Sequence, residues 1–353
     1  MSEPLVPVFD GHNDVLLRLW KDAAPDAEQR FLDGLEGGHL DLLRCRAGGM
    51  AGGFFAMFVP SRGQDLSGVV QLAGGEAPMP PTPDLADAQA ATVAMTSILL
   101  RIERLSAGGV RICRTVADIR AAMADGALAT ILHIEGAEAI DPDFRMLDVL
   151  EAAGLRSIGP VWSRPNIFGH GVPFRYPSSP DTGPGLTELG KELVRQCNRR
   201  RMVVDLSHIN EKGFWDVARL STAPLVATHS NVHAECAASR NLTRLQLDAI
   251  RASRGVVGLN FATSFLRADG KASADTPFDD LLRHLDAMLD ALGEDGVAIG
   301  SDFDGALIPK AIGDAAGLPR LVDAMRAHGY GDALVRKIAH ENWLALLERT
   351  WGA

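Results

Sequence analysis

The sequence is poor in cysteine, and none of its cysteines have the spacing of a disulfide scaffold or a thiolate metal site. The four residues Cys45, Cys113, Cys197 and Cys236 are scattered and form no CxxC pair. We therefore expect reduced thiols with structural roles.

The sequence also shows no long hydrophobic run and no pattern typical of a targeting signal. We expect no apolar run to reach the length of a membrane span, and neither MSEPLVPVFDGHND at the start nor RTWGA at the end resembles a signal peptide or a lipid anchor. Acidic residues outnumber basic residues by 45 to 35. The resulting net charge of -10 argues against nucleic acid or an anionic membrane surface as the main partner. We expect a cytoplasmic protein that binds neither.

Several common catalytic motifs are absent. The chain has no GxGxxG followed by an acid, no GxxxxGK[ST], no GxSxG and no HExxH. Dinucleotide, nucleotide, serine-hydrolase and zincin chemistry all lose support.

What the chain does contain is a regular alternation of strand-like and helix-like segments. Eight β-type runs stand out, at 6–14, 53–59, 127–135, 156–163, 202–209, 225–230, 255–261 and 297–302. Helical patterns lie at 84–105, 116–124, 144–153, 186–200, 211–220, 245–251, 278–292, 318–328 and 332–349. Eight βα units over 353 residues predict a (β/α)8 TIM barrel, with a doubly wound open sheet as the alternative. We find no linker and expect one domain over residues 1–353.

Two long segments rich in glycine and proline, about 61–84 and 165–185, each follow a strand. That order places them at the carboxyl end of the predicted barrel, where long loops are usually functional. For the first segment, a flexible surface insertion is an equal alternative to a substrate wall.

Polar residues of metal-ligand type gather at the ends of five predicted strands. His12 and Asp14 are two residues apart, so in a strand they leave the backbone on the same face. Four further strands end in Glu135, His208, His229 and Asp302, so five strands bring residues of metal-ligand type to the same end of the barrel. Charged groups are rarely buried unless they are paired or bind metal.

Neighbouring polar residues receive structural interpretations. His133 is expected to be a core histidine, Asp10 to support His12, and Asp205 with Ser207 to face the helix layer and fix their strand by hydrogen bonds. Four histidines in helical or loop contexts are expected at the surface: His39, His284, His328 and His340.

These motifs resemble the membrane (renal) dipeptidases and their bacterial relatives, within the metal-dependent amidohydrolase superfamily. The resemblance runs along nearly the whole chain, through DGHND (10–14), HIEG (133–136), DLSH (205–208), ATHSN (227–231), SRN (239–241), GSDFDG (300–305) and ENWL (341–344).

The resemblance implies two zinc ions per chain. His12, Asp14 and Glu135 would bind one ion, and His208 and His229 would bind the other, with Glu135 as the bridge. It further implies that Asp302 is the general acid and base and that Arg240 holds the carboxylate of the substrate.

One position departs from the family pattern. Trp162 stands where the renal enzyme has a histidine that contacts the substrate and helps to stabilise the tetrahedral intermediate. An indole has one N–H donor and no cationic form, so it cannot replace a charged donor. His170, in the loop that follows, is either a substitute for that histidine or an exposed residue.

With the resemblance, these features predict a homodimeric dipeptidase that cleaves small dipeptides with a metal-bridging hydroxide. The alternative within the superfamily is hydrolysis of N-acyl amino acids or a related amide with a free carboxylate. A catalytically silent binding protein on the same barrel is the alternative from a different class.

Overall fold

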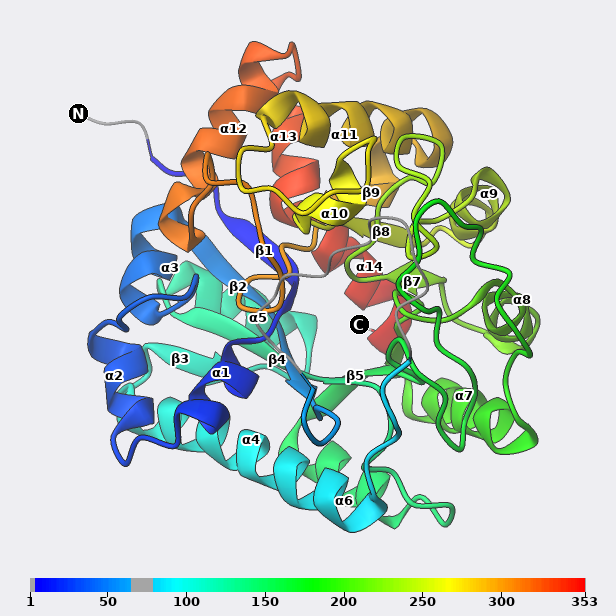
Figure 1. Ribbon diagram of the computed structural model, residues 1–353. Coiled ribbons are helices and arrows are strands. Elements are labelled where there is room, and N and C mark those ends of the chain that lie inside the picture. The colour runs from blue at the N-terminus through cyan, green and yellow to red at the C-terminus, as the bar shows by residue number, and fades with distance from the viewer. Residues whose placement is uncertain (1–3, 65–78, 353) are drawn as a thin grey trace.

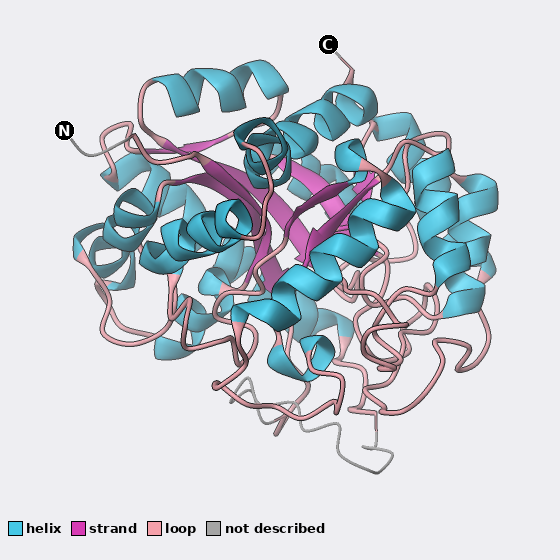
Figure 2. Cartoon of the chain, turned by 90° about the horizontal axis from the view of Figure 1, so that it is seen from above, coloured by secondary structure: helices cyan, strands magenta, loops and turns pink. Residues whose placement is uncertain are grey.

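The computed structural model describes residues 4–64 and 79–352 and has a parallel barrel of strands surrounded by helices (Figures 1 and 2). Its strands are β1 (Val8–Asn13), β2 (Met50–Phe58), β3 (Val110–Ile112), β4 (Leu128–Glu135), β5 (Leu155–Gly159), β6 (Val203–Val204), β7 (Val226–Ala227), β8 (Val256–Leu259) and β9 (Val297–Ile299). They pair in the order β6-β5-β4-β2-β1-β9-β8-β7, while β3 pairs only with the amino-terminal residues of β4, 128–130. All of these pairings are parallel.

Helices follow most of the strands and form the outer layer. They are α1 (Val15–Asp22), α2 (Ala27–Asp33), α3 (Leu42–Gly48), α4 (Leu85–Leu105), α5 (Val116–Ala124), α6 (Arg145–Ala153), α7 (Glu188–Arg200), α8 (Glu211–Leu220), α9 (Arg244–Ala252), α10 (Thr263–Leu266), α11 (Phe278–Leu292), α12 (Leu318–Ala327), α13 (Asp332–Arg336) and α14 (Asn342–Trp351). Short 3₁₀ turns lie at Glu294–Gly296 and Ala315–Gly317, and a π-helical turn at Lys337–Glu341 joins α13 to α14.

The predicted (β/α)8 barrel is confirmed. Each of the eight expected runs contains or overlaps one barrel strand, and β3 is an additional strand outside the barrel path. The helices α1, α2, α3 and α10 were not expected. The single domain over residues 1–353 stays a prediction.

The barrel closes between β6 and β7 through side chains more than through main chain. One isolated parallel bridge joins Asp205 to Val226. The Asp205 carboxylate accepts hydrogen bonds from the backbone and hydroxyl of Ser207, at 3.1 and 2.6 Å, and from the backbone and hydroxyl of Thr228, at 2.8 and 2.6 Å. The hydrogen bonds to this carboxylate therefore replace some of the main-chain hydrogen bonds that two strands of only two residues each cannot make.

The expected orientation of Asp205 is wrong, although its role in hydrogen bonding is confirmed. Its Oδ2 lies 3.6 Å from Nε2 of His133, a buried ring inside the barrel that also lies 2.9 Å from the Ser157 hydroxyl. The strand β6 ends at Val204, so the alternation of side chains between two faces does not continue to Asp205.

The amino-terminal half of the barrel interior is filled by apolar side chains. Phe9, Phe54 and Trp343 belong to one buried cluster, and the indole N–H of Trp343 donates to the carbonyl of Ile299. Gly11 lies so close that a Cβ there would be 2.2 Å from the Thr228 carbonyl oxygen and 2.6 Å from the Trp343 ring. A side chain at Gly11 would therefore clash with the barrel core, and only the other end of the barrel is left for polar chemistry.

The helix α4 corrects one expectation. Among residues 4–64 and 79–352 it is the one helix that by length and composition could cross a membrane, with 44% of its most apolar window buried. In the fold it packs against α1, α2 and β2 as part of the outer layer.

The predicted surface position of His284 is also wrong. His284 is fully buried on α11, where its Nδ1 accepts from the backbone of Val232 at 3.1 Å and its Nε2 lies 2.9 Å from the carbonyl oxygen of Leu266. Burial lowers the pKa of His284 to about 4, so the ring is neutral near pH 7.

Candidate metal centre

The first half of the predicted site lies where β1 enters α1. The Nε2 atom of His12 lies 3.2 Å from Oδ2 of Asp14, and both side chains are buried. The proximity predicted from their spacing is confirmed. The backbone N–H of Asp14 donates to the carbonyl of Phe303 at 2.8 Å, which ties this turn to the segment after β9.

Glu135, at the end of β4, presents one oxygen to three imidazoles. Its Oε1 lies 2.7 Å from Nε2 of His208, 3.4 Å from Nε2 of His229 and 3.7 Å from Nε2 of His12. The structure therefore brings all five predicted metal ligands together, and Glu135 lies between the two halves of the set.

Hydrogen bonds from neighbouring residues fix the orientation of the histidines. The Thr228 hydroxyl donates to Asp205, so it accepts from Nδ1–H of His229, 2.8 Å away. The proton on Nδ1 leaves Nε2 of His229 with its lone pair directed into the site. The Ser163 hydroxyl lies 2.8 Å from Nδ1 of His208 and orients that ring in the same way.

The electrostatics of the cluster suit a cation. Burial lowers the pKa of His208 and of His229 well below the ordinary value, so both rings are neutral. Burial also raises the pKa of Glu135. Although burial opposes a charge on His12, the carboxylates of Glu135 and Asp14 raise its pKa to about 10. This corner of the site therefore favours a positive charge.

The donor set fits a metal ion. Ligand atoms of His12, Glu135 and His229 all lie within 4.8 Å of one another, as do those of His12, Asp14 and Asp302. The atoms Nδ1 of His12 and Oδ1 of Asp14 are buried without a hydrogen-bond partner in the described part of the chain. Neutral imidazoles and carboxylates in a buried cluster are the ligands that divalent transition metals prefer.

Asp302 follows β9 in a tight turn and faces the same cluster. Its backbone has φ of 60°, and its Oδ2 accepts from the side-chain amide of Asn260 at 2.9 Å. A Cβ on Gly305 would lie 2.1 Å from Asp14 and 2.5 Å from Asp302, so this close approach requires glycine. Burial raises the pKa of Asp302, because the charged carboxylate loses its hydration there.

Arg240 is a buried cation beside the cluster. Its Nη1 donates to the Ser230 hydroxyl at 2.8 Å and its Nη2 to the carbonyl of His229 at 2.9 Å. These partners are neutral, and no salt bridge within 4.0 Å joins Arg240 to a carboxylate in the described residues. Burial lowers its pKa to about 10, which leaves the guanidinium charged at pH 7.

Comparison with known families decides the affiliation. The sequence model described as "Membrane dipeptidase (Peptidase family M19)" matches residues 4–351. This chain belongs to the membrane dipeptidase family. As an M19 metallopeptidase it is a metal-dependent hydrolase that acts on peptide bonds.

Relatives of this M19 peptidase match it over most of their length. A Klebsiella pneumoniae protein described as "Uncharacterized protein in pqqA 5'region" is 51% identical over 255 residues, which cover 72% of this chain and 94% of the relative. The crystal structure of a metallopeptidase called dipeptidase AC is 56% identical, with a TM-score of 0.94 over 99% of this chain and 100% of that one. A Rhodobacter sphaeroides metallopeptidase, liganded with a phosphinate mimic of the dipeptide L-Ala-D-Ala, is 55% identical with the same TM-score and the same coverage.

In this M19 peptidase Trp162 lies in an arc of aromatic rings beside the metal ligands. Its ring centre is 4.8 Å from that of Phe58, 5.4 Å from Phe174 and 5.7 Å from His208. Phe174 in turn stacks on Phe265, above which the guanidinium of Arg240 lies at 5.9 Å. We call Phe58, Trp162, Phe174 and Phe265 the aromatic arc.

His170 lies in the loop after β5, but its ring is directed toward the base of that loop. Its Nδ1 lies 3.4 Å from the carbonyl oxygen of Gly185. The two residues that follow His170 do reach the metal centre. Gly171 pairs with Ile209, and the backbone N–H of Val172 donates to the carbonyl of His208. A role of the His170 side chain in substrate binding stays a prediction.

The two long loops meet near the carboxyl end of the barrel. Residues 65–78 of the first lie outside the described residues, whereas its two described arms are joined by a hydrogen bond from the Ser61 hydroxyl to the carbonyl of Pro81. The Thr82 hydroxyl donates to the carbonyl of Pro165 at 2.6 Å, which connects the first loop to the second.

Some residues of the site were missed from the sequence. Ser163, Thr228 and Asn260 orient His208, His229 and Asp302, as described above. The signal for Asn260 was present, because it is a polar residue at the end of a predicted strand. Asp10 was expected to support His12. Its carboxylate accepts from the backbone and hydroxyl of Ser301 at 2.7 and 2.8 Å, and it also interacts with the backbone of His12.

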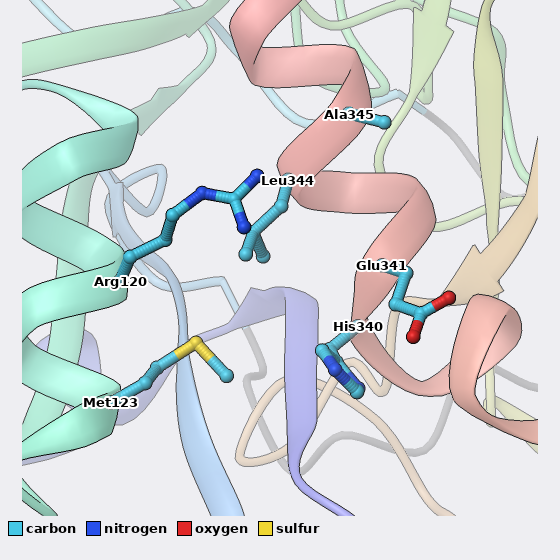
Figure 3. Close-up of a pocket in the computed structure, with 6 residues that line it drawn as sticks. All are labelled: Arg120, Met123, His340, Glu341, Leu344 and Ala345. Carbon is cyan, nitrogen blue, oxygen red and sulfur yellow. The ribbon is translucent and has the colours of Figure 1, made fainter.

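Among the hollows in the described part of the chain, two lie at the amino-terminal side of the barrel, away from this centre. One, of about 550 Å³, lies between α5 and the π-helical turn with α14 and is lined by Arg120, Met123, His340, Glu341, Leu344 and Ala345 (Figure 3). The other, of about 250 Å³, also reaches Met123 and includes Pro7 and Met50, at the amino ends of β1 and β2. Neither contains a predicted site residue.

Proposed function

We propose that this M19 peptidase hydrolyses small dipeptides with two zinc ions. His12, Asp14 and Glu135 would hold one ion, and His208 and His229, with Glu135 as the bridge, would hold the other. The observation that carries the proposal is the position of Oε1 of Glu135, within 3.7 Å of Nε2 of all three histidines.

Zinc at these ligands would supply water of lowered pKa at neutral pH and would polarise the carbonyl of the scissile bond. The protein contributes the arrangement around that chemistry. Thr228 keeps the Nδ1 proton on His229, and Ser163 orients His208, so the two ligands need no reorganisation when metal binds.

Asp302 is the proposed general base and acid. Its carboxylate lies in the group formed with His12 and Asp14, and Asn260 holds one of its oxygens. It accepts a proton from the attacking water and delivers it to the nitrogen of the leaving amine.

Arg240 is the proposed anchor for the carboxylate of the substrate. The guanidinium is buried, charged and bound only to neutral oxygens, and its Nε has no partner in the described residues. A substrate carboxylate would complete these hydrogen bonds and neutralise the charge.

The substrate would be short and would place an apolar side chain on the aromatic arc. Support comes from the Rhodobacter sphaeroides relative, which is liganded with a mimic of L-Ala-D-Ala. Because Trp162 cannot act as a charged donor, the arc would contribute apolar contact rather than charge stabilisation.

Hydrolysis of N-acyl amino acids is the second candidate, because Arg240 would hold their carboxylate equally well. The test combines metal analysis with a screen of L-L and L-D dipeptides beside their N-acetyl analogues. We expect about two metal ions per chain and cleavage that requires a free amino terminus. Cleavage of the N-acetyl compounds alone would overturn the dipeptidase assignment.

Two further predictions accompany this proposal. A cytoplasmic location and a homodimer stay predictions from the sequence. Light scattering of the purified protein and fractionation of the source cells test them independently of activity.

A further inference from the structure

A fully buried ion pair lies behind the aromatic arc and has no role in the mechanism above. Nε of Arg164 donates to Oε1 of Glu138 at 2.9 Å, and both side chains have 0% exposure. Arg164 follows β5 and Glu138 follows β4. Burying two charges is costly even when they are paired, so the pair calls for a reason other than stability.

The guanidinium of Arg164 joins the ends of three strands. Besides Glu138, it donates to the Ser61 hydroxyl at 2.9 Å and to the carbonyl of Val59 at 2.6 Å, both of which follow β2. Its centre lies 5.3 Å from the ring of Phe58 and 5.3 Å from the ring of Trp162. The planar fork of arginine can make these hydrogen bonds and also lie against two rings, which lysine cannot do.

The same pair reaches the candidate metal ligands on both sides. On the arginine side, the adjacent Ser163 holds Nδ1 of His208, and Trp162 lies against the His208 ring. On the glutamate side, a Cβ on Gly136 would lie 2.4 Å from Oε2 of Glu138, and Gly136 directly follows Glu135. One residue therefore separates the ion pair from each of two ligands.

We propose that Arg164, neutralised by Glu138, is a positioning residue that fixes Trp162 in the aromatic arc and thereby determines which substrate side chains the site accepts. The inference rests on the proposed dipeptidase function. Arg164 has no exposed surface and so cannot touch the substrate, whereas Trp162 is partly exposed and would contact it. Arg164 acts through Trp162.

The test is a double-mutant cycle on substrate selectivity. The variant Arg164→Met/Glu138→Gln removes both charges together, so it leaves no unpaired buried charge, and it is combined with Trp162→Phe. The readout is the ratio of kcat/KM for leucyl-alanine and alanyl-alanine, with metal content measured on each protein. The matched control is Arg200→Met/Glu151→Gln, which removes a pair that joins α7 to α6.

We call Arg164→Met/Glu138→Gln the charge-free variant. We expect it to change the selectivity ratio about tenfold with the metal content unchanged, and we expect Trp162→Phe to change the ratio by a similar factor. The combined variant should change it no further than Trp162→Phe alone. Additive effects, or a lower thermal midpoint with an unchanged ratio, would overturn the inference and leave Arg164 a structural residue.

A second measurement does not depend on turnover. The fluorescence of Trp162 is measured in metal-free protein. For each background, the spectrum of the protein with Trp162→Phe is subtracted from the spectrum of the same protein with Trp162. We expect this difference spectrum to shift in the charge-free variant and to stay constant in the control, and a constant spectrum in both would contradict the inference. If the wild type cleaves no dipeptide, the proposed function fails while the fluorescence still decides the role of Arg164.

Discussion

The Nε2 atoms of His208 and His229 lie 3.1 Å apart, and both face the same oxygen of Glu135. Because Thr228 keeps a proton on Nδ1 of His229, the Nε2 atom of that ring has only a lone pair to offer. Burial holds both rings neutral. A cation between these atoms would take the lone pair of His229 and the oxygen of Glu135 as ligands.

Replacing Thr228 by valine tests this relationship, because valine keeps the shape and removes the acceptor for Nδ1–H. We expect the affinity for the metal ion at His229 to fall about 10- to 100-fold. Competition with a chromophoric chelator measures it. The control Thr130→Val removes another buried hydroxyl, which binds the carbonyl of Arg111. Equal affinities in the two variants would contradict the role of Thr228.

Asp302→Asn should lower kcat by about 10²- to 10⁴-fold, because an amide cannot accept the proton that the reaction transfers. The metal content should stay at the wild-type value, as measured by mass spectrometry of the digested protein. Asp286→Asn, an exposed carboxylate bound to His328 and Tyr330, is the control. An Asp302→Asn enzyme with near-normal kcat would remove Asp302 from the mechanism.

Arg240→Met should raise KM for a dipeptide about 10- to 100-fold, because it removes the charge-assisted hydrogen bonds to the substrate carboxylate. The sharper readout is the preference for a dipeptide over its C-terminal amide. The wild type should prefer the free acid, and the variant should lose that preference. Arg244→Met, at an exposed position on α9, should keep it. A retained preference in the Arg240 variant would place the carboxylate elsewhere.

Asp205→Asn should destabilise the closure of the barrel between β6 and β7. An amide group has one acceptor oxygen, so it cannot accept all four hydrogen bonds that Ser207 and Thr228 donate to the carboxylate. The expected loss is about 2 to 4 kcal/mol, seen as a thermal midpoint several degrees lower. A midpoint equal to that of Asp286→Asn would show that the closure does not depend on this carboxylate.

The buried His284 should make the protein sensitive to acid. Its pKa is lowered from 6.5 to about 4 in the folded state, so between these values the unfolded state binds more protons. Stability is then complete above pH 6.5 and is lost as the pH falls toward 4, by about 3 kcal/mol at most. His284→Gln should show a smaller fall in thermal midpoint between pH 7 and pH 4.5, whereas exposed His328→Gln should match the wild type. Parallel profiles for all three proteins would refute the assignment.

The metal cluster could be predicted because each ligand lies at or shortly after the carboxyl end of a strand, and these ends converge on one edge of a parallel barrel. His12 and Asp14 share a face by spacing alone, and Glu135, His208 and His229 follow the same rule. Arg240 depended on the resemblance to a family, since nothing in its local pattern marks a buried guanidinium.

Other features could not be predicted where side chains replace regular structure. The strand β6 has only two residues, so the two-residue period failed at Asp205. In contrast, the burial of His284 could have been predicted from the sequence, because His284 shares the apolar face of α11 with Leu281, Leu285 and Met288. The pair of Arg164 and Glu138 joins residues 26 apart, and no local pattern encodes such a contact.

A zinc titration of the metal-depleted protein tests the central claim most directly, with hydrolysis of L-alanyl-D-alanine as the readout. We predict that activity appears on addition of zinc and reaches its plateau at two equivalents per chain. A plateau at one equivalent would contradict the two-ion site, and the absence of hydrolysis of this and other dipeptides at saturating zinc would contradict the dipeptidase assignment.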